Sequence, residues 1–288
     1  MEDESEGGTT RPLPPTLAAP LFAPLSDAFV ALLRSLGPAD WERPTVSARW
    51  NVREIAAHVL DGQLRRLSFQ RDAWLVPPPE RPIAGRADLV AFLDGLNASW
   101  VSAARRLSPR VLTDLLERAG REVGDMASGL DPCAPALFAV AWAGEAESLV
   151  WFDLARDLTE HWHHQQQIRL AVGAPLLLEP RFSVPVLDTF ARALPHAYRE
   201  TVAPGGAAVA IAVTPPVARA WALVRAGGAW TLEEGEPPAP AARIAVDGES
   251  AWRILTGGLD PAEGRKRAAV EGDERLAAPF FTAVAIMK

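Results

Sequence analysis

Apolar residues recur every three or four positions through the first half of the chain. This spacing places them on one face of a helix with 3.6 residues per turn. The pattern predicts four main helices: residues 17–36, 51–74, 88–107 with a restart at Pro109 that continues to 122, and 143–171. Four helices that each carry one apolar stripe favour a four-helix bundle.

The second of these helices has a well-defined start. Asn51 can cap it, and Glu54 follows three residues later, so Asn51-Val52-Arg53-Glu54 is a predicted capping box. Residues 125–137 contain Gly and Pro and are predicted to form a loop. The last helix of the bundle is expected to end at Gly173, shortly before Pro175.

The hydrophobic period changes to two after Pro204-Gly205-Gly206, as is typical of strands. Four strands are predicted, at residues 209–213, 221–225, 230–232 and 243–246, and helices at 184–199, 248–255 and 273–286. The chain is therefore expected to be a two-domain α+β protein. Its predicted parts are a disordered tail at 1–16, a helical bundle at 17–200 and a small α+β domain at 201–288.

Composition and charge narrow the classes of function. The 29 Lys and Arg are outnumbered by 36 Asp and Glu, which disfavours binding to a nucleic-acid backbone. The chain has no apolar run of about 18 residues, so no membrane span is expected. A single cysteine, Cys133, cannot form an internal disulfide, and the acidic start lacks the basic region of a secretory signal. These features predict a cytoplasmic protein.

Histidines are concentrated near one point of the last bundle helix. Glu160 and His164 are four residues apart, so they share a helix face and can bind one cation. His58 on the second helix is expected to face the bundle interior and to supply a third ligand. Two histidines and a carboxylate suit one divalent metal, zinc first and then nickel, iron or manganese, with an open coordination position.

Other readings of these residues stay open at this point. His163 is also at a suitable distance from Glu160, three residues along. Glu54 and His58 repeat the Glu-x-x-x-His spacing, which would suit a dinuclear site, although capping explains Glu54 more simply. Taken singly, a histidine of this kind is usually a hydrogen-bonded core residue, and a Glu–His pair is often a solvated helix face.

Two segments resemble motifs of the DinB-like superfamily. Trp50-Asn51-Val52-Arg53-Glu54-Ile55-Ala56-Ala57-His58 resembles its second-helix motif, in the branch of mycothiol-dependent maleylpyruvate isomerase. Glu160 to Ile168 resembles the second motif of that family, in which the last ligand histidine is followed by two residues and then Gln-Ile. This match selects His164 over His163. Segments 242–248, 251–257 and 271–273 resemble the small sterol-carrier-like (SCP2-like) domain of the same branch.

The resemblance implies a divalent metal, often zinc, and a low-molecular-weight thiol as cosubstrate. Glu160 stands where many DinB-like proteins have a histidine, as in the maleylpyruvate isomerase branch. Gly257-Gly258 replaces a Gly-Arg expected in that branch, which removes one cation that would bind substrate.

The leading hypothesis is therefore a metal-dependent enzyme that uses a thiol, as an S-transferase or a maleylpyruvate-isomerase-like cis–trans isomerase. A metal-bound thiol is deprotonated, which makes it a nucleophile at neutral pH. An anionic substrate would need a cation, and Arg65 and Arg156 are the candidates. The expected partners are a small-molecule substrate and a thiol, with no nucleic acid and no membrane; a homodimer is compatible with these expectations.

Two alternatives belong to other classes. A metal-bound water would make the protein a hydrolase. A non-catalytic protein would use the metal structurally, in a closed site with a fourth ligand such as Asp61 or His161.

Overall fold

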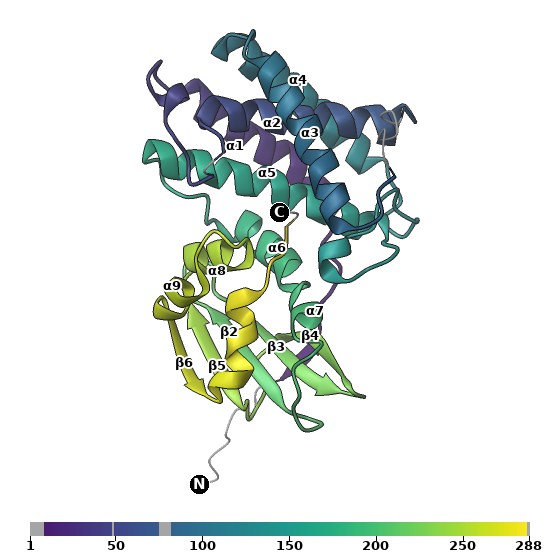
Figure 1. Cartoon of the computed structure of the whole chain (residues 1–288), viewed down its shortest axis with the longest axis vertical. Coiled ribbons are helices and arrows are strands. Elements are labelled where there is room, and N and C mark those ends of the chain that lie inside the picture. The colour runs from purple at the N-terminus through teal and green to yellow at the C-terminus, as the bar shows by residue number, and fades with distance from the viewer. Residues whose placement is uncertain (1–8, 48, 75–81, 287–288) are drawn as a thin grey trace. The chain divides into compact units, whose positions relative to one another are not determined.

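The computed structural model describes residues 9–47, 49–74 and 82–286. Contacts within the chain divide these residues into two compact units. The bundle unit comprises residues 17–137 and 149–176, and the sheet unit comprises 9–16, 138–148 and 177–286. The chain therefore starts in the sheet unit and returns to it twice (Figure 1).

The bundle unit is built from the predicted helical stretches. Its helices are α1 (Phe22–Arg34), α2 (Val52–Arg66), α3 (Arg86–Ala104), α4 (Pro109–Ser128) and α5 (Val150–Val172). The predicted capping box is present at the start of α2: the Asn51 side chain accepts a bond from the Glu54 amide at 2.9 Å, and the Glu54 carboxylate accepts one from the Asn51 amide at 3.2 Å. At its other end α2 continues into one π-helical turn, Leu67–Arg71.

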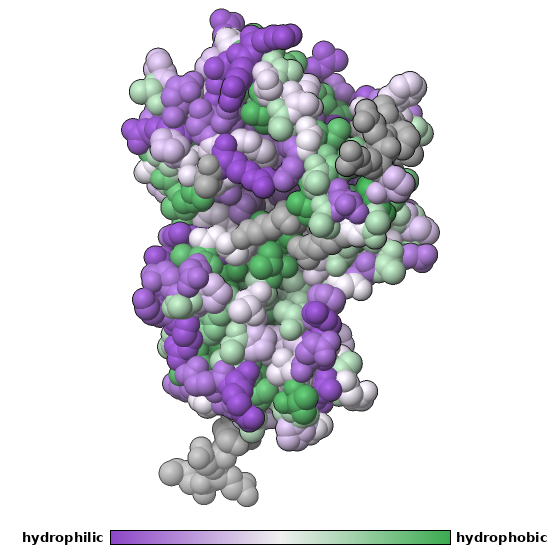
Figure 2. Space-filling view, in the orientation of Figure 1, coloured by the Kyte–Doolittle hydropathy of each residue, from purple (hydrophilic) through white to green (hydrophobic). Residues whose placement is uncertain are grey.

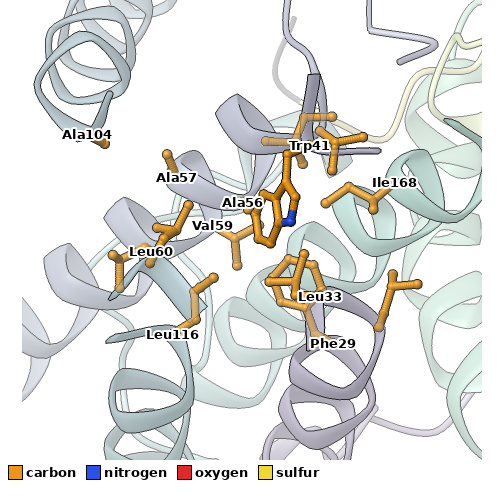
Figure 3. Packing of buried hydrophobic residues seen from close by; sticks show 14 of the residues in the cluster. Phe29, Leu33, Trp41, Ala56, Ala57, Val59, Leu60, Ala104, Leu116 and Ile168 are labelled. Carbon is orange, nitrogen blue, oxygen red and sulfur yellow. The ribbon is translucent and has the colours of Figure 1, made fainter. Parts of the chain in front are cut away.

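Side chains from all five helices of this unit and from one loop fill the core of the bundle (Figure 3). Phe29 and Leu33 of α1 meet α2, α4 and α5, and Trp41 packs onto them from the loop after α1. Burying each large apolar side chain contributes about 1.5–3 kcal/mol to folding. Gly120 of α4 lies close to α1, because an added Cβ there would stand 2.0 Å from Ser26 Oγ.

The sheet unit contains one six-stranded sheet with the strand order β1-β4-β3-β2-β5-β6. Its strands are β1 (Thr10–Pro12), β2 (Ala208–Val213), β3 (Arg219–Ala226), β4 (Ala229–Gly235), β5 (Ala242–Val246) and β6 (Ala268–Gly272). The pair β2–β5 is parallel and every other pair is antiparallel. Its helices are α6 (Pro180–Ala191), α7 (Leu194–Ala197), α8 (Gly248–Leu255), α9 (Pro261–Lys266) and α10 (Glu274–Ala277).

The two-domain α+β prediction is confirmed, and several element bounds differ from the sequence-based ones. Helix α4 continues to Ser128, into the stretch predicted as a loop, whereas α5 begins at Val150 and not at residue 143. Residues 273–286 form only the short helix α10 and one 3-10 segment, Ala278–Thr282, in which Pro279 has no amide proton for a regular helix.

The outer strands of the sheet differ most from the sequence prediction. Residues 10–12 lie in the predicted tail, yet they form β1 against β4. Strand β6, which pairs with β5, was not predicted. Helices α6 and α7 belong to the sheet unit, so the chain leaves the bundle unit near residue 177 and not near residue 200. Each of these differences depends on a partner distant in sequence, which local periodicity does not register.

Polar side chains gather over α9 on the face of the sheet unit seen in Figure 2. Among the helices in the described part of the chain, none combines the length and the apolar character needed to cross a membrane.

Candidate metal centre

The imidazoles of His58 and His164 lie together, although they come from different helices. Their ring centroids are 4.7 Å apart, with the ring planes at 85°. His58 is on the second turn of α2, and His164 is in the middle of α5. The two helices therefore place at one point the two histidines that the sequence motifs single out.

Trp50 covers this histidine pair from the loop before α2. Its ring centroid is 4.6 Å from that of His58 and 6.4 Å from that of His164. The loop is closed by a bond from the Thr45 hydroxyl to the Trp50 carbonyl at 2.6 Å, and by a bridge between Pro44 and Asn51. The indole is thus held as an apolar wall against both imidazoles.

Glu160 is the carboxylate at this point. Its Oε2 lies 3.5 Å from His164 Nε2, one turn further along α5. Two donors that share one ion in a tetrahedral arrangement, with bonds of about 2.0–2.2 Å, lie roughly 3.3–3.6 Å apart. The Glu160–His164 spacing therefore matches that of two ligands to one metal ion.

The second nitrogen of His164 is held by Gln167. His164 Nδ1 lies 2.9 Å from Gln167 Oε1, and Gln167 Nε2 lies 3.0 Å from His163 Nε2. All three side chains are buried in the bundle. His163, which the sequence left as an alternative ligand, thus has one ring nitrogen bonded to Gln167.

The protonation states of His58 and Glu160 are those that favour binding of a cation. Burial, reinforced by the nearby charge of His164, lowers the pKa of His58 to about 3, so this imidazole is neutral at physiological pH. Burial would raise the pKa of Glu160, but its hydrogen bond to His164 and the charge of that ring outweigh burial and lower the pKa to about 2. A neutral imidazole and an ionised carboxylate are the forms that bind metals.

One buried atom at this point lacks a hydrogen-bond partner within the described part of the chain: Nδ1 of His58. An unpaired buried nitrogen is costly unless it binds a proton donor, water or a metal. However, no three His, Cys, Asp or Glu side chains among the described residues are arranged to hold one ion as they stand. Three of these side chains could therefore hold one ion only after one of them rotates.

A buried ionic network adjoins the centre. Arg66 of α2 donates from Nε to Asp157 Oδ2 at 2.5 Å and from Nη1 to Asp153 Oδ2 at 2.6 Å. Burial would raise the pKa of Asp157, but the charges of Arg66 and Arg156 outweigh it and lower the pKa to about 2. The network ties α2 to α5 one turn away from Glu160.

Both candidate substrate cations have carboxylate partners in this structure. Arg65 lies 3.1 Å from Asp61 Oδ2 and donates to Asn97 Oδ1 at 3.0 Å. Arg156 donates to Asp153 Oδ1 at 2.6 Å. A substrate anion would have to displace or join these partners.

The other residues considered from sequence lie apart from the Glu160–His164 pair or have other contacts. His161 packs edge-on against Phe22, with ring centroids 5.8 Å apart. Asp61 lies beside Arg65, and burial raises the pKa of this carboxyl against the effect of that charge. Glu54 caps α2 and accepts from Arg105 at 2.6 Å, as its capping role predicts. Cys133 is an exposed free thiol in a loop.

Sequence reasoning missed two contributors to the centre. Gln167 follows His163 and His164 by four and three residues, a helical spacing that could have indicated a contact. Trp50 opens the first motif, but nothing in its local pattern shows that it covers the histidines.

Comparison with known proteins shows which family and which solved structures this chain is similar to. A family model described as the mycothiol maleylpyruvate isomerase N-terminal domain matches residues 22–169. The chain is similar in fold to a crystal structure of a histidine-to-alanine mutant of the mycothiol-dependent maleylpyruvate isomerase, with a TM-score of 0.54 and 12% identity over 91% of this chain and 95% of that one. A second structure of the mycothiol-dependent maleylpyruvate isomerase gives 0.50 and 14% over 86% and 90%. No curated protein matches significantly.

Proposed function

Because the chain belongs to the family of the mycothiol maleylpyruvate isomerase N-terminal domain, we propose that it is a metal-dependent enzyme that uses a low-molecular-weight thiol. Its reaction would be S-transfer or a maleylpyruvate-isomerase-like cis–trans isomerisation. The observation that carries the proposal is the meeting of the His58 and His164 rings, 4.7 Å apart, beside the Glu160 carboxylate.

In this proposal His58, Glu160 and His164 hold one divalent metal, zinc in the first place, with nickel, iron or manganese as alternatives. Glu160 and His164 already have the spacing of two ligands, and His58 Nδ1 has no hydrogen-bond partner among the residues that the structure describes. When bound, the ion supplies the charge that keeps a coordinated thiol in its thiolate form at neutral pH. Rotation of the His58 side chain completes the ligand set.

The remaining groups orient the reactants. The Trp50 indole excludes water from one side of the histidine pair. A substrate carboxylate would be bound by Arg65 or Arg156, whose present carboxylate partners hold these cations near the centre. In an isomerisation, the thiolate sulfur forms a bond to one carbon of a carbon–carbon double bond that is conjugated to a carbonyl, and the π electrons shift toward the carbonyl oxygen. The former double bond is then a single bond, about which the substrate rotates. The electrons return to re-form the double bond as the carbon–sulfur bond breaks.

Cobalt titration tests both parts of the proposal. The background should carry Cys133→Ala, because this exposed thiol could itself bind cobalt. We expect one equivalent of cobalt per chain, lost in Glu160→Gln and in His164→Ala and retained in His196→Ala, whose histidine is outside the bundle unit. Added mycothiol, or another biological thiol from a panel, should produce a sulfur-to-cobalt absorption band.

The outcomes separate the parts of the proposal. Absence of stoichiometric cobalt binding would contradict the metal centre. Cobalt binding without a sulfur band from any thiol would contradict thiol chemistry and leave hydrolysis by a metal-bound water as the function to pursue.

A further inference from the structure

The Gln167 side chain lies between two histidines of its own helix. Its carbonyl oxygen is 2.9 Å from His164 Nδ1, and its amide nitrogen is 3.0 Å from His163 Nε2. Gln167, His163 and His164 are 7%, 7% and 8% exposed, so water does not readily replace either contact.

The two ends of a glutamine amide are chemically different, which fixes the protons on both rings. The oxygen accepts only, so His164 Nδ1 must carry the proton that is donated to it. The NH₂ group donates only, so His163 Nε2 must present a lone pair. Reversing the amide would require the opposite protonation on both rings at once, so each contact holds the other in place.

This assignment determines which nitrogen of His164 is available. With the proton on Nδ1 held by Gln167, Nε2 is the nitrogen that can exchange its proton for an ion, and it faces Glu160 Oε2 at 3.5 Å. An ion held by Glu160 and His164 can therefore bind only through Nε2. His58, in contrast, has no hydrogen-bond partner at Nδ1 among the residues that the structure describes.

We propose that Gln167 is a positioning residue for the metal centre: with His163 as its anchor, it fixes the tautomer and ring orientation of His164. The inference rests on the proposed metal site. Partners that hold the second nitrogen of a ligand histidine commonly contribute 10–100-fold to metal affinity. Gln167 then makes the Glu160–His164 pair the preorganised half of the site, and His58 the half that adjusts.

Zinc affinity, measured by competition with a chromophoric chelator, tests this role with three variants. Gln167→Met has a similar volume without the amide and should lose about 10–100-fold in affinity. Gln167→Glu retains an acceptor for His164 Nδ1 and should recover most of that loss. His163→Phe should weaken binding in the wild-type background and have no further effect combined with Gln167→Met, because both changes act through one contact.

Nitrogen-15 spectra of the histidine rings report the tautomer of His164, which would not change in the variant if Gln167 had only a structural role. At alkaline pH, His164 of the metal-free wild-type protein should be protonated at Nδ1, and Gln167→Met should mix the two tautomers. A wild-type His164 protonated at Nε2, or equal zinc affinities for the wild type and Gln167→Met, would overturn the inference. If the wild type binds no zinc, the proposed function fails, and the tautomer of the metal-free protein still decides the role of Gln167.

Discussion

Arg66 shows how a single side chain can set the relation between two helices. Only 2% of its side chain is exposed, and it donates to both Asp153 and Asp157, which are one turn apart on α5. A buried charge is tolerated only with such partners, and removing one partner leaves the others uncompensated. The network therefore fixes α2 against α5 and, with it, the approach of His58 to His164.

Replacing Arg66 with Met should lower the free energy of unfolding by up to about 3–5 kcal/mol, because Asp153 and Asp157 lose the more buried of their two cations and keep only Arg156. Urea denaturation measures this loss. The matched control is Arg118→Met, which removes an exposed ion pair with Glu122 on α4 and should change stability by less than about 0.5 kcal/mol. Equal losses in the two variants would contradict the role given to Arg66.

Glu234 should make the sheet unit sensitive to acid. Burial would raise the pKa of its carboxyl, but the bonds from Arg219 and Arg11 outweigh burial and lower the pKa below its usual 4.5. The stabilisation is therefore fully present above that value and is lost as the pH falls through the lowered pKa.

Glu234→Gln should accordingly cost about 1–3 kcal/mol near neutral pH and progressively less in acid. Urea midpoints of both proteins, followed from about pH 7 to about pH 3, give the comparison. A difference that stays constant or grows as the pH falls would show that the carboxylate charge is not the cause.

At the scale of elements, the close approach of α1 and α4 depends on the absence of a side chain. A Cβ at Gly120 would meet Ser26 Oγ at 2.0 Å and Ser26 Cβ at 2.9 Å, so rotation of the serine hydroxyl does not relieve the contact. Gly95 in α3, in contrast, has open space at the same position.

Gly120→Ala should therefore destabilise the bundle unit by about 1–3 kcal/mol through overpacking. Gly95→Ala should instead stabilise it by roughly 0.5–1 kcal/mol, because alanine restricts the unfolded chain and favours the helix. Thermal unfolding of the two variants should thus shift in opposite directions; a shift in the same direction would refute the packing argument.

Elements with a regular local pattern were predictable from the sequence. The capping box of α2 and the central strands β2 to β5 fall where side-chain type and period placed them. Strand β1 was not predictable, since Thr10–Pro12 carry no strand period and gain their conformation from β4.

The sequence indicated the residue types of the candidate centre, but it did not indicate the neighbouring side chains that hold them. The spacing of Glu160 and His164 indicated a shared helix face, and the family motif selected His164 over His163. Periodicity could not show that Trp50 covers the two rings or that Gln167 joins His163 to His164. Those contacts depend on how loops and rotamers meet in three dimensions.

At the scale of the whole molecule, the residues of the candidate centre lie within one of the two units. His58, Glu160 and His164 all belong to the bundle unit, and the whole six-stranded sheet belongs to the other. A ligand that binds only the native state of one unit stabilises that unit by mass action.

Zinc at about 100 times its dissociation constant should therefore stabilise the bundle unit by about 2.7 kcal/mol. Hydrogen exchange should show added protection at amides of α2 and α5 and no change in β2 or β5. Glu160→Gln should show neither effect. Protection of the sheet strands to the same extent would contradict a centre contained in the bundle.

The pairing of β1 with β4 has a consequence for synthesis and for expression. Arg11 is synthesised 223 positions before its ion-pair partner Glu234. Strand β1 therefore stays unpaired until the bundle and most of the sheet have been synthesised. A shortened version that begins at residue 17, where the bundle starts, would leave the border of β4 open to neighbouring molecules, a known route to aggregation. Truncated versions made for crystallisation should therefore retain Thr10–Pro12.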